Sequence, residues 1–169
     1  MIRLAAAISL LALLSGALPA GAQSITCPPG TKLDGTESDA GKFQWCEQAT
    51  PGGPIRQGPM VGFHRNGRRS FELTFVEGTP RGTIRAWYEG GQPSMTGETR
   101  PDNGTLILWD ERGRRRAQID VRDRQVVTQA WDEQGKEERY DEKKLVKVFP
   151  ANRNLSFIMN LFAVGIGIQ

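Results

Sequence analysis

The chain has 169 residues, with 22 lysine and arginine side chains against 19 aspartates and glutamates. This length is typical of one domain. The net charge of +3 is too small to steer the protein towards nucleic acid. Basic runs such as 114–116 lie close to acidic residues, which indicates ion pairs on a solvated strand face. We therefore expect no nucleic-acid partner.

Residues 1–22 have the pattern of a secretory signal peptide. Arg3 supplies the positive start, residues 4–14 are apolar, and Ala20 and Ala22 form a small-residue cleavage motif. The alternative is a membrane anchor, but the apolar stretch is short for a permanent spanning helix. Cleavage would lower the net charge to +2 and would place the mature chain in the periplasm or outside the cell.

Cys27 and Cys46 are the two cysteines of the chain. In an exported protein an isolated pair predicts a disulfide. A metal site is a poor alternative, because two thiols and the one distant histidine, His64, fall short of the usual four ligands. The spacing also differs from the C-x-x-C of reactive pairs. We expect a structural disulfide and no metal.

Residues 23–56 form a separate N-terminal segment. Proline, glycine, threonine and aspartate are frequent there, and they predict turns rather than long helices. Residues 42–46 could form one short strand, so the segment could be a degenerate first repeat. The disulfide would tie it to the edge of a sheet.

Residues 57–142 contain a ladder of glycines and aromatics. The ladder glycines recur at spacings of 24, 22 and 22 residues, and an aromatic stands four positions before each of them. Glycine also opens the first three units, at Gly58, Gly82 and Gly104, and Val126 replaces it in the fourth. A period of this length predicts a repeat architecture. The ladder consists of Gly67, Gly91, Gly113 and Gly135 with Phe63, Trp87, Trp109 and Trp131.

Each period has room for two short strands and two tight turns. Residues 71–75 and 117–121 alternate between apolar and polar side chains, as half-buried strands do. The units therefore predict successive hairpins. The expected fold class is all-β, an antiparallel meander of about seven to nine strands.

The ladder glycines are predicted to lie at the hairpin tips. A three-residue loop needs a positive φ only at its last position, where every unit has glycine. A two-residue loop would need positive φ at Arg112 and Gln134 as well. The three-residue loop also places Asp110 opposite Arg114, and Asp132 opposite Lys136.

The same register predicts which side chains share a face. Trp109 would lie with Ala117, Ile119 and Val121 on a mostly buried face. The ladder aromatics are therefore predicted to be core residues, with a glycan- or peptide-binding platform as the alternative. The opposite face would receive Met60, Ile84, Leu106 and Leu108.

Residues 143–169 form a strand and an apolar tail. Residues 145–149 could be a last strand, which Pro150 would end. Residues 155–169 carry no charge and are too few to span a membrane comfortably as a helix. A one-layer sheet must bury its apolar face, so we expect the tail to cover that face. A membrane-surface contact or a subunit interface are the alternatives, and periodicity does not separate helix from strand here.

The unit Gly-x4-Trp-[Tyr/Asp]-x2-Gly-[Gln/Arg/Lys] resembles the MORN-repeat variant of bacterial proteins in the YwqK antitoxin-like family. Residues 58–68, 82–92 and 104–114 carry the resemblance, which covers about half of the chain, residues 57–140. Val126 and Phe63 depart from the pattern. The resemblance implies an antiparallel array of hairpins that serves as a binding or structural module.

Candidate catalytic residues are few. His64 would have to serve as the base for any nucleophile, and it lies at a hairpin shoulder. Glu89, Glu111 and Glu133 recur at successive tips, but polar residues are expected in turns. We expect no catalytic site and no cofactor.

The sequence therefore favours an exported, non-enzymatic module that binds another protein or a component of the cell envelope. The alternative is a carbohydrate- or membrane-surface-binding module that uses the tryptophan ladder or the tail.

Overall fold

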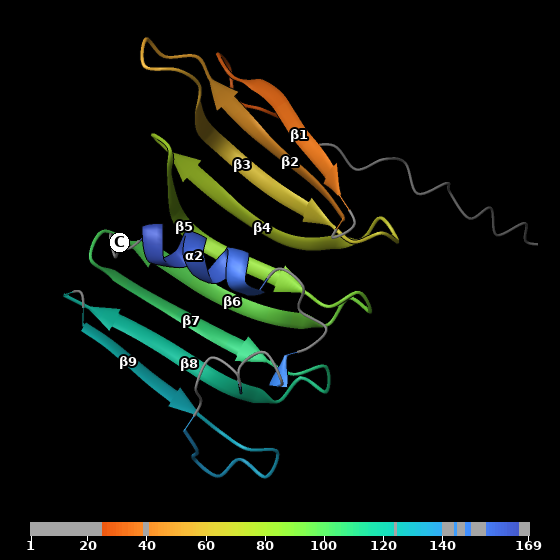
Figure 1. Cartoon of the computed structure of the whole chain (residues 1–169), viewed down its shortest axis with the longest axis vertical. Coiled ribbons are helices and arrows are strands. Elements are labelled where there is room, and N and C mark those ends of the chain that lie inside the picture. The colour runs from red at the N-terminus through yellow and green to blue at the C-terminus, as the bar shows by residue number, and fades with distance from the viewer. Residues whose placement is uncertain are drawn as a thin grey trace, which may run out of the picture.

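The computed structural model describes residues 25–38, 41–123, 125–139, 144, 148, 149 and 155–165. The predicted signal peptide, residues 1–22, lies outside these. Nine strands form one antiparallel sheet in the order of the sequence, which confirms the predicted meander (Figure 1). The strands are β1 (Lys32–Ser38), β2 (Gly41–Gln48), β3 (Ile55–Phe63), β4 (Arg69–Val76), β5 (Thr79–Trp87), β6 (Pro93–Arg100), β7 (Asn103–Trp109), β8 (Arg115–Arg122) and β9 (Gln125–Ala130).

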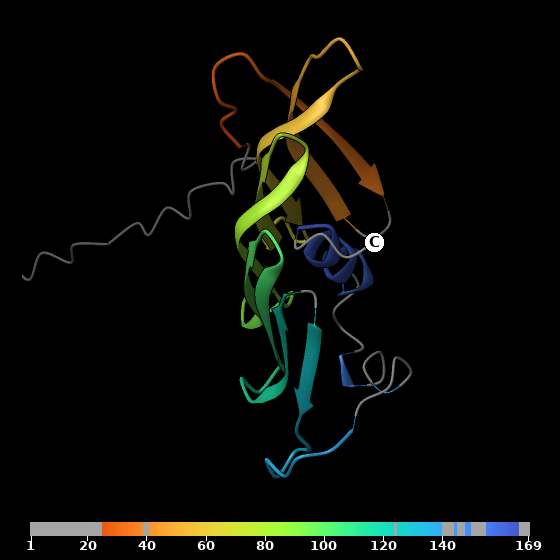
Figure 2. The same cartoon turned by 90° about the vertical axis from the view of Figure 1, so that its left-hand side faces the viewer.

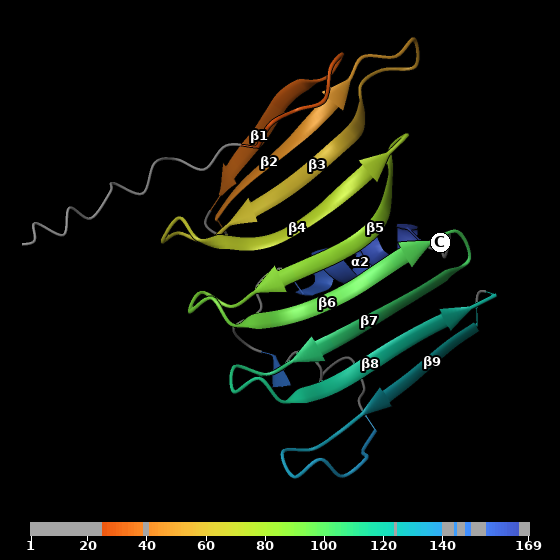
Figure 3. The same cartoon turned by 180° about the vertical axis from the view of Figure 1, so that it is seen from behind.

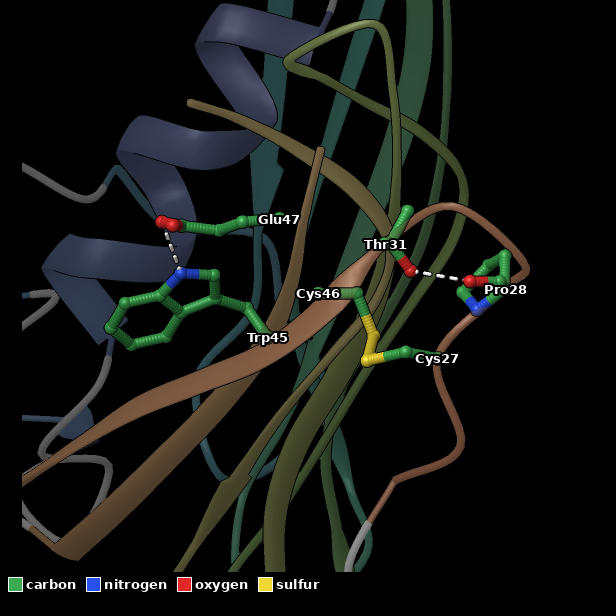
Figure 4. Close-up of a disulfide and its surroundings, with 6 residues drawn as sticks. All are labelled: Cys27, Pro28, Thr31, Trp45, Cys46 and Glu47. Atoms are coloured by element: carbon green, nitrogen blue, oxygen red, sulfur yellow. Dashed lines mark hydrogen bonds between the residues drawn. A yellow bond between two sulfur atoms is a disulfide. The ribbon is translucent and has the colours of Figure 1, made fainter. Parts of the chain in front are cut away.

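The N-terminal segment contributes a full hairpin rather than the one short strand predicted for residues 42–46. Strand β1 pairs with β2, and β2 pairs with β3. Strand β1 is an edge strand whose described side chains are mostly exposed, and its sequence is mostly polar on both faces, so alternation did not reveal it. The predicted disulfide between Cys27 and Cys46 is present and ties the start of the segment to β2 (Figure 4).

All four ladder glycines close three-residue loops, as predicted. At the first tip, His64 and Arg68 are joined by a backbone hydrogen bond of 2.8 Å, and the Gly67 amide donates to the His64 carbonyl at 2.9 Å. The same pair of bonds recurs at the next three tips. The four glycines have φ values of 80°, 94°, 74° and 80°.

The prediction that the ladder aromatics share a face with Ala117, Ile119 and Val121 is wrong. Directly after each of the first three loops, one extra residue enters the returning strand as a β-bulge. Trp109 pairs with Arg115, but Leu108 pairs with Ala117, so one residue is passed over. A one-residue shift reverses which side chains share a face. The extra residues are Ser70, Ser94 and Arg116, and all three are buried.

The buried face instead combines the two apolar sets that were predicted to lie on opposite faces. One row of residues, each paired with the next on the adjacent strand, crosses the sheet from β2 to β9. A second row beside it on the same face includes the paired residues Met60 and Leu73. Most members of these rows belong to one buried apolar cluster. The crossing row is Phe43, Gly62, Phe71, Ala86, Met95, Leu108, Ala117 and Ala130.

Helix α2 (Leu155–Gly165) covers this apolar face. It lies across β5 and β6 (Figure 1), and the edge-on view places it on one side of the sheet (Figure 2). Leu161 and Phe162 are buried in the apolar cluster, whereas Val164 is 49% exposed. The tail therefore covers the apolar face, as predicted, and its described part is helical. Among the residues with described structure, no helix is both long enough and apolar enough to cross a membrane.

The predicted C-terminal strand over residues 145–149 lies mostly outside the described residues. Val148 and Phe149 are described, and neither belongs to a strand. Phe149 is buried in the same apolar cluster as α2. Phe149 therefore adds to the core rather than to the sheet.

Candidate functional site

The face of the sheet opposite α2, which we call the open face, carries a row of mostly polar side chains. The strand register aligns them from β3 to β9, and strands β5 and β6 lie in front of the helix when the sheet is seen from behind (Figure 3). Alternation along each strand turns these residues away from the apolar cluster. The row consists of Val61, Glu72, Arg85, Thr96, Ile107, Gln118 and Gln129.

The ladder tryptophans lie on the open face beside this row. Trp87, Trp109 and Trp131 each follow a residue of the buried face, and each is partly exposed. The Trp109 indole donates to Thr96 Oγ1 at 3.4 Å, and the Arg115 guanidinium lies 4.2 Å from the centre of the Trp131 ring. Phe63 differs, because it is only 5% exposed. Three tryptophans therefore form an aromatic row, with Trp87 and Trp109 at the ends of β5 and β7 and Trp131 directly after β9.

The backbone carbonyls of these tryptophans accept hydrogen bonds from side chains of the preceding unit. His64 Nε2 donates to the Trp87 carbonyl at 2.9 Å, and the Tyr88 hydroxyl donates to the Trp109 carbonyl at 2.7 Å. Arg116 Nε donates to the Trp131 carbonyl at 2.8 Å. These bonds join neighbouring hairpins and give His64 a structural role.

A cavity of about 410 Å³ lies at the hairpin tips on the side of the C-terminal segment. Asp110 is part of its lining, and Asp110 Oδ1 accepts hydrogen bonds from the backbone amides of Arg112 and Arg114, both at 3.0 Å. Asp110 Oδ2 accepts Arg114 Nη2 at 2.8 Å and lies 3.4 Å from Arg116 Nη1. The predicted pairing of Asp110 with Arg114 is confirmed. This network is internally paired, so it stabilises the tip rather than offering free charge to a ligand.

The surroundings of Asp110 and Tyr88 shift the pKa values of their side chains. Burial acts to raise the pKa of the Asp110 carboxyl, but hydrogen bonds from the Arg114 amide and guanidinium and from the Arg112 amide hold the pKa below its ordinary value. For Tyr88, burial first and then the nearby Glu111 and Asp110 charges raise the pKa of the hydroxyl above its ordinary value. The hydroxyl therefore stays protonated and donates to the Trp109 carbonyl.

Replacing Asp110 by asparagine should lower the free energy of unfolding at neutral pH by about 2 kcal/mol, because Arg116 would lose its carboxylate in a buried site. A carboxyl with a lowered folded pKa stabilises the protein above its unfolded pKa of about 3.9, and this stabilisation is lost as pH falls through the folded pKa. The stabilities of the wild type and of Asp110→Asn should therefore converge as the pH falls through the lowered folded pKa of Asp110. Urea unfolding across the acid range tests this, and a constant difference would contradict it.

The glutamates at successive tips do not assemble into a site. The backbone carbonyl of Glu89 accepts Asn66 Nδ2 at 3.1 Å, and that of Glu133 accepts Arg114 Nη1 at 3.1 Å. The Glu133 carboxylate lies 3.5 Å from Arg114 Nη2. Glu111 lines the tip cavity. In the described part of the chain, no group of three or more histidine, cysteine or acidic side chains is placed to hold a metal.

A groove of about 680 Å³ opens on the open face between the N-terminal segment and strands β3 to β5. Ile25 and Thr26 form part of its lining. Its charged side chains are Arg69, Glu72 and the strand β5 residues Arg81 and Arg85. It belongs to the same face as the tryptophan row, because Arg85 and Trp87 are two positions apart on β5.

Sequence reasoning missed the groove and the bulge residues. The arginines of the groove come from two strands, and their convergence depends on the register between β4 and β5. One pattern in the sequence could have revealed the bulges. The apolar sets before and after each loop are out of phase, and one extra residue after the loop brings them to one face.

Comparison of the chain with protein-family models and with curated proteins found no match.

Proposed function

We propose that this chain is an exported, non-enzymatic binding module of the cell envelope, and that its open face binds an extended carbohydrate. The observation that supports this is the position of α2. Because α2 covers the opposite face, Trp87, Trp109 and Trp131 stay partly exposed and lie outside the apolar cluster. The tail has its own place in the core through Leu161 and Phe162, which favours the open face over the tail as the binding surface.

The chemistry of the open face suits a sugar chain. Sugar rings pack their C–H faces on aromatic rings, and their hydroxyls exchange hydrogen bonds with side chains such as Thr96 and Gln118. Consecutive tryptophans are two strands apart, roughly 10 Å. An extended polysaccharide with alternately turned rings presents the same ring face at a comparable repeat. A chain that runs across the strands could therefore stack on successive tryptophans.

Other features support export and a binding role. The Cys27–Cys46 disulfide suits an oxidising compartment, in line with the signal peptide predicted for residues 1–22. The resemblance to MORN-repeat variants implies a binding or structural module. His64, the histidine that a nucleophile would require, is engaged by the Trp87 carbonyl.

A protein partner is the second candidate, and strand β9 favours it. Strand β9 is an edge of the sheet and contains no charged residue, although edge strands are commonly protected by charge. Val126 and Val127 are 54% and 59% exposed. A partner could add a strand there through backbone hydrogen bonds.

Replacing Trp109 by alanine should weaken binding to manno- or chito-oligosaccharides by about tenfold, because the central ring of the row is lost. Trp45→Ala is the matched control, since Trp45 lies on the helix side of β2 (Figure 4) and packs against the apolar cluster. The control should bind as the wild type does. Isothermal titration calorimetry on both folded variants makes the comparison.

Two results would count against the carbohydrate proposal. One is wild-type protein that binds none of the cello-, manno- and chito-oligosaccharides. The other is a Trp109→Ala variant that keeps full affinity. A different pattern would favour the second candidate, a protein partner at β9. That partner would still bind the Trp109→Ala variant but would no longer bind the Val127→Lys variant.

A further inference from the structure

The groove on the open face holds an excess of positive charge. Four charged side chains line it, three arginines and one glutamate. Glu72 is shared, with its carboxylate 2.6 Å from Arg69 Nη1 and 3.0 Å from Arg85 Nη1. The lining side chains therefore carry three guanidinium groups and one carboxylate, and the groove favours an anionic ligand.

The arginines keep donors for such a ligand. A guanidinium has five N–H groups, and the contact with Glu72 uses one nitrogen of Arg69 and one of Arg85. Their side chains are 47% and 53% exposed, so the remaining N–H groups can reach solvent or ligand. The shared Glu72 also restrains both side chains, which lowers the entropy lost when they bind a planar anion.

The disulfide fixes the remaining wall of the groove. Ile25 and Thr26 precede Cys27 directly, and Cys27 is bonded to Cys46 on β2. Pro28 packs against Gly58 of β3, where a Cβ atom would lie 2.8 Å from the proline ring. The segment is thus held against the sheet, and the groove is a built feature of the fold.

We infer that this groove is a subsite for a carboxylate-bearing sugar, so that the preferred ligand is an acidic glycan. The inference rests on the proposed function, because it takes the sugar chain to continue from Trp87 into the groove. Arg85 and Trp87 lie two positions apart on one face of β5, which makes the two surfaces continuous. The planar guanidinium fork matches a carboxylate, and the aromatic row selects a sugar rather than a free anion.

The test compares two ligands that differ only in charge. Mannuronate oligosaccharides carry a carboxylate where manno-oligosaccharides of the same linkage and length carry a hydroxymethyl group. Wild-type protein should bind the mannuronate chain about tenfold more tightly, with an affinity that falls as salt rises. The double variant Arg81→Gln, Arg85→Gln should lose this preference. Arg112→Gln removes the same charge at an exposed tip and should keep it.

Any result other than these contradicts either the acidic subsite or the carbohydrate proposal itself. A preference that survives in the double variant, or that is absent in the wild type, overturns the acidic subsite and leaves the carbohydrate proposal standing. If the double variant loses affinity for both oligosaccharides equally, the arginines contribute to binding without selecting a carboxylate, and the acidic subsite is also overturned. Binding of neither ligand overturns both proposals. Equal competition by a polyglutamate peptide reassigns the groove to acidic peptides. If the double variant does not fold, Arg81→Gln and the salt dependence of the wild type provide the same comparison.

Discussion

Replacing Gly62 by valine should destabilise the protein by about 3 kcal/mol or more, because the site has no room for a side chain. Gly62 lies in the apolar row between Phe43 and Phe71, whose ring centres are 5.7 Å apart. A Cβ atom at this position would lie 2.6 Å from Ser70 Oγ and still closer to the Phe71 ring. The ring cannot move away without opening the core, since Phe71 is fully buried.

Thermal unfolding followed by circular dichroism measures this effect. Gly52→Ala is the matched control, because the nearest atom to a Cβ there is Thr50 Oγ1 at 3.9 Å and the position needs no positive φ. The control should unfold within about 0.5 kcal/mol of the wild type. A Gly62→Val protein with wild-type stability would mean that Phe71 does not pack over the glycine.

Removing the disulfide should destabilise the protein about as much as Gly62→Val does. Cys27 and Cys46 are 19 positions apart, and closing a loop of this size stabilises a protein by about 3 kcal/mol in the chain-entropy description. Cys46 is 1% exposed, and Cys27 holds the segment that packs on Gly58. The double variant Cys27→Ser, Cys46→Ser should therefore lose about 3 kcal/mol.

The loss should be localised as well as global. Amide hydrogen exchange should rise first in residues 25–38 and in β2, while β5 to β8 stay protected. Wild-type protein in reductant should behave as the double variant does. An unchanged unfolding midpoint in both would show that other contacts hold the segment in place.

The hairpin tips could be predicted because their requirement is local. A positive φ at one position selects glycine, and the ladder repeats that selection at Gly67, Gly91, Gly113 and Gly135. The antiparallel order and a number of strands between about seven and nine followed from the spacing of these turns, although β1 was not foreseen. The disulfide followed from the isolated cysteine pair in a chain with a predicted signal peptide.

The assignment of faces could not be predicted in the same way. A bulge depends on which backbone hydrogen bonds form across two strands, and Ser70 and Ser94 show nothing of this locally. One unrecognised extra residue moved Trp109 from the predicted core to the open face. The candidate site was missed because the predicted register placed the tryptophans in the core, and because the groove arginines of β4 and β5 come together only through the pairing of those two strands.

The simple order of the sheet has a consequence for how the chain folds. Every strand pairs with its neighbour in sequence, so the contacts of the sheet are local and the entropy lost in closing each hairpin is small. Each new hairpin can therefore add to the edge left by the one before it. The apolar face is covered only when α2, the last described element of the chain, packs on it. Until the C-terminus is complete, a growing sheet would present that face to solvent, and this is the interval in which the protein is most exposed to aggregation.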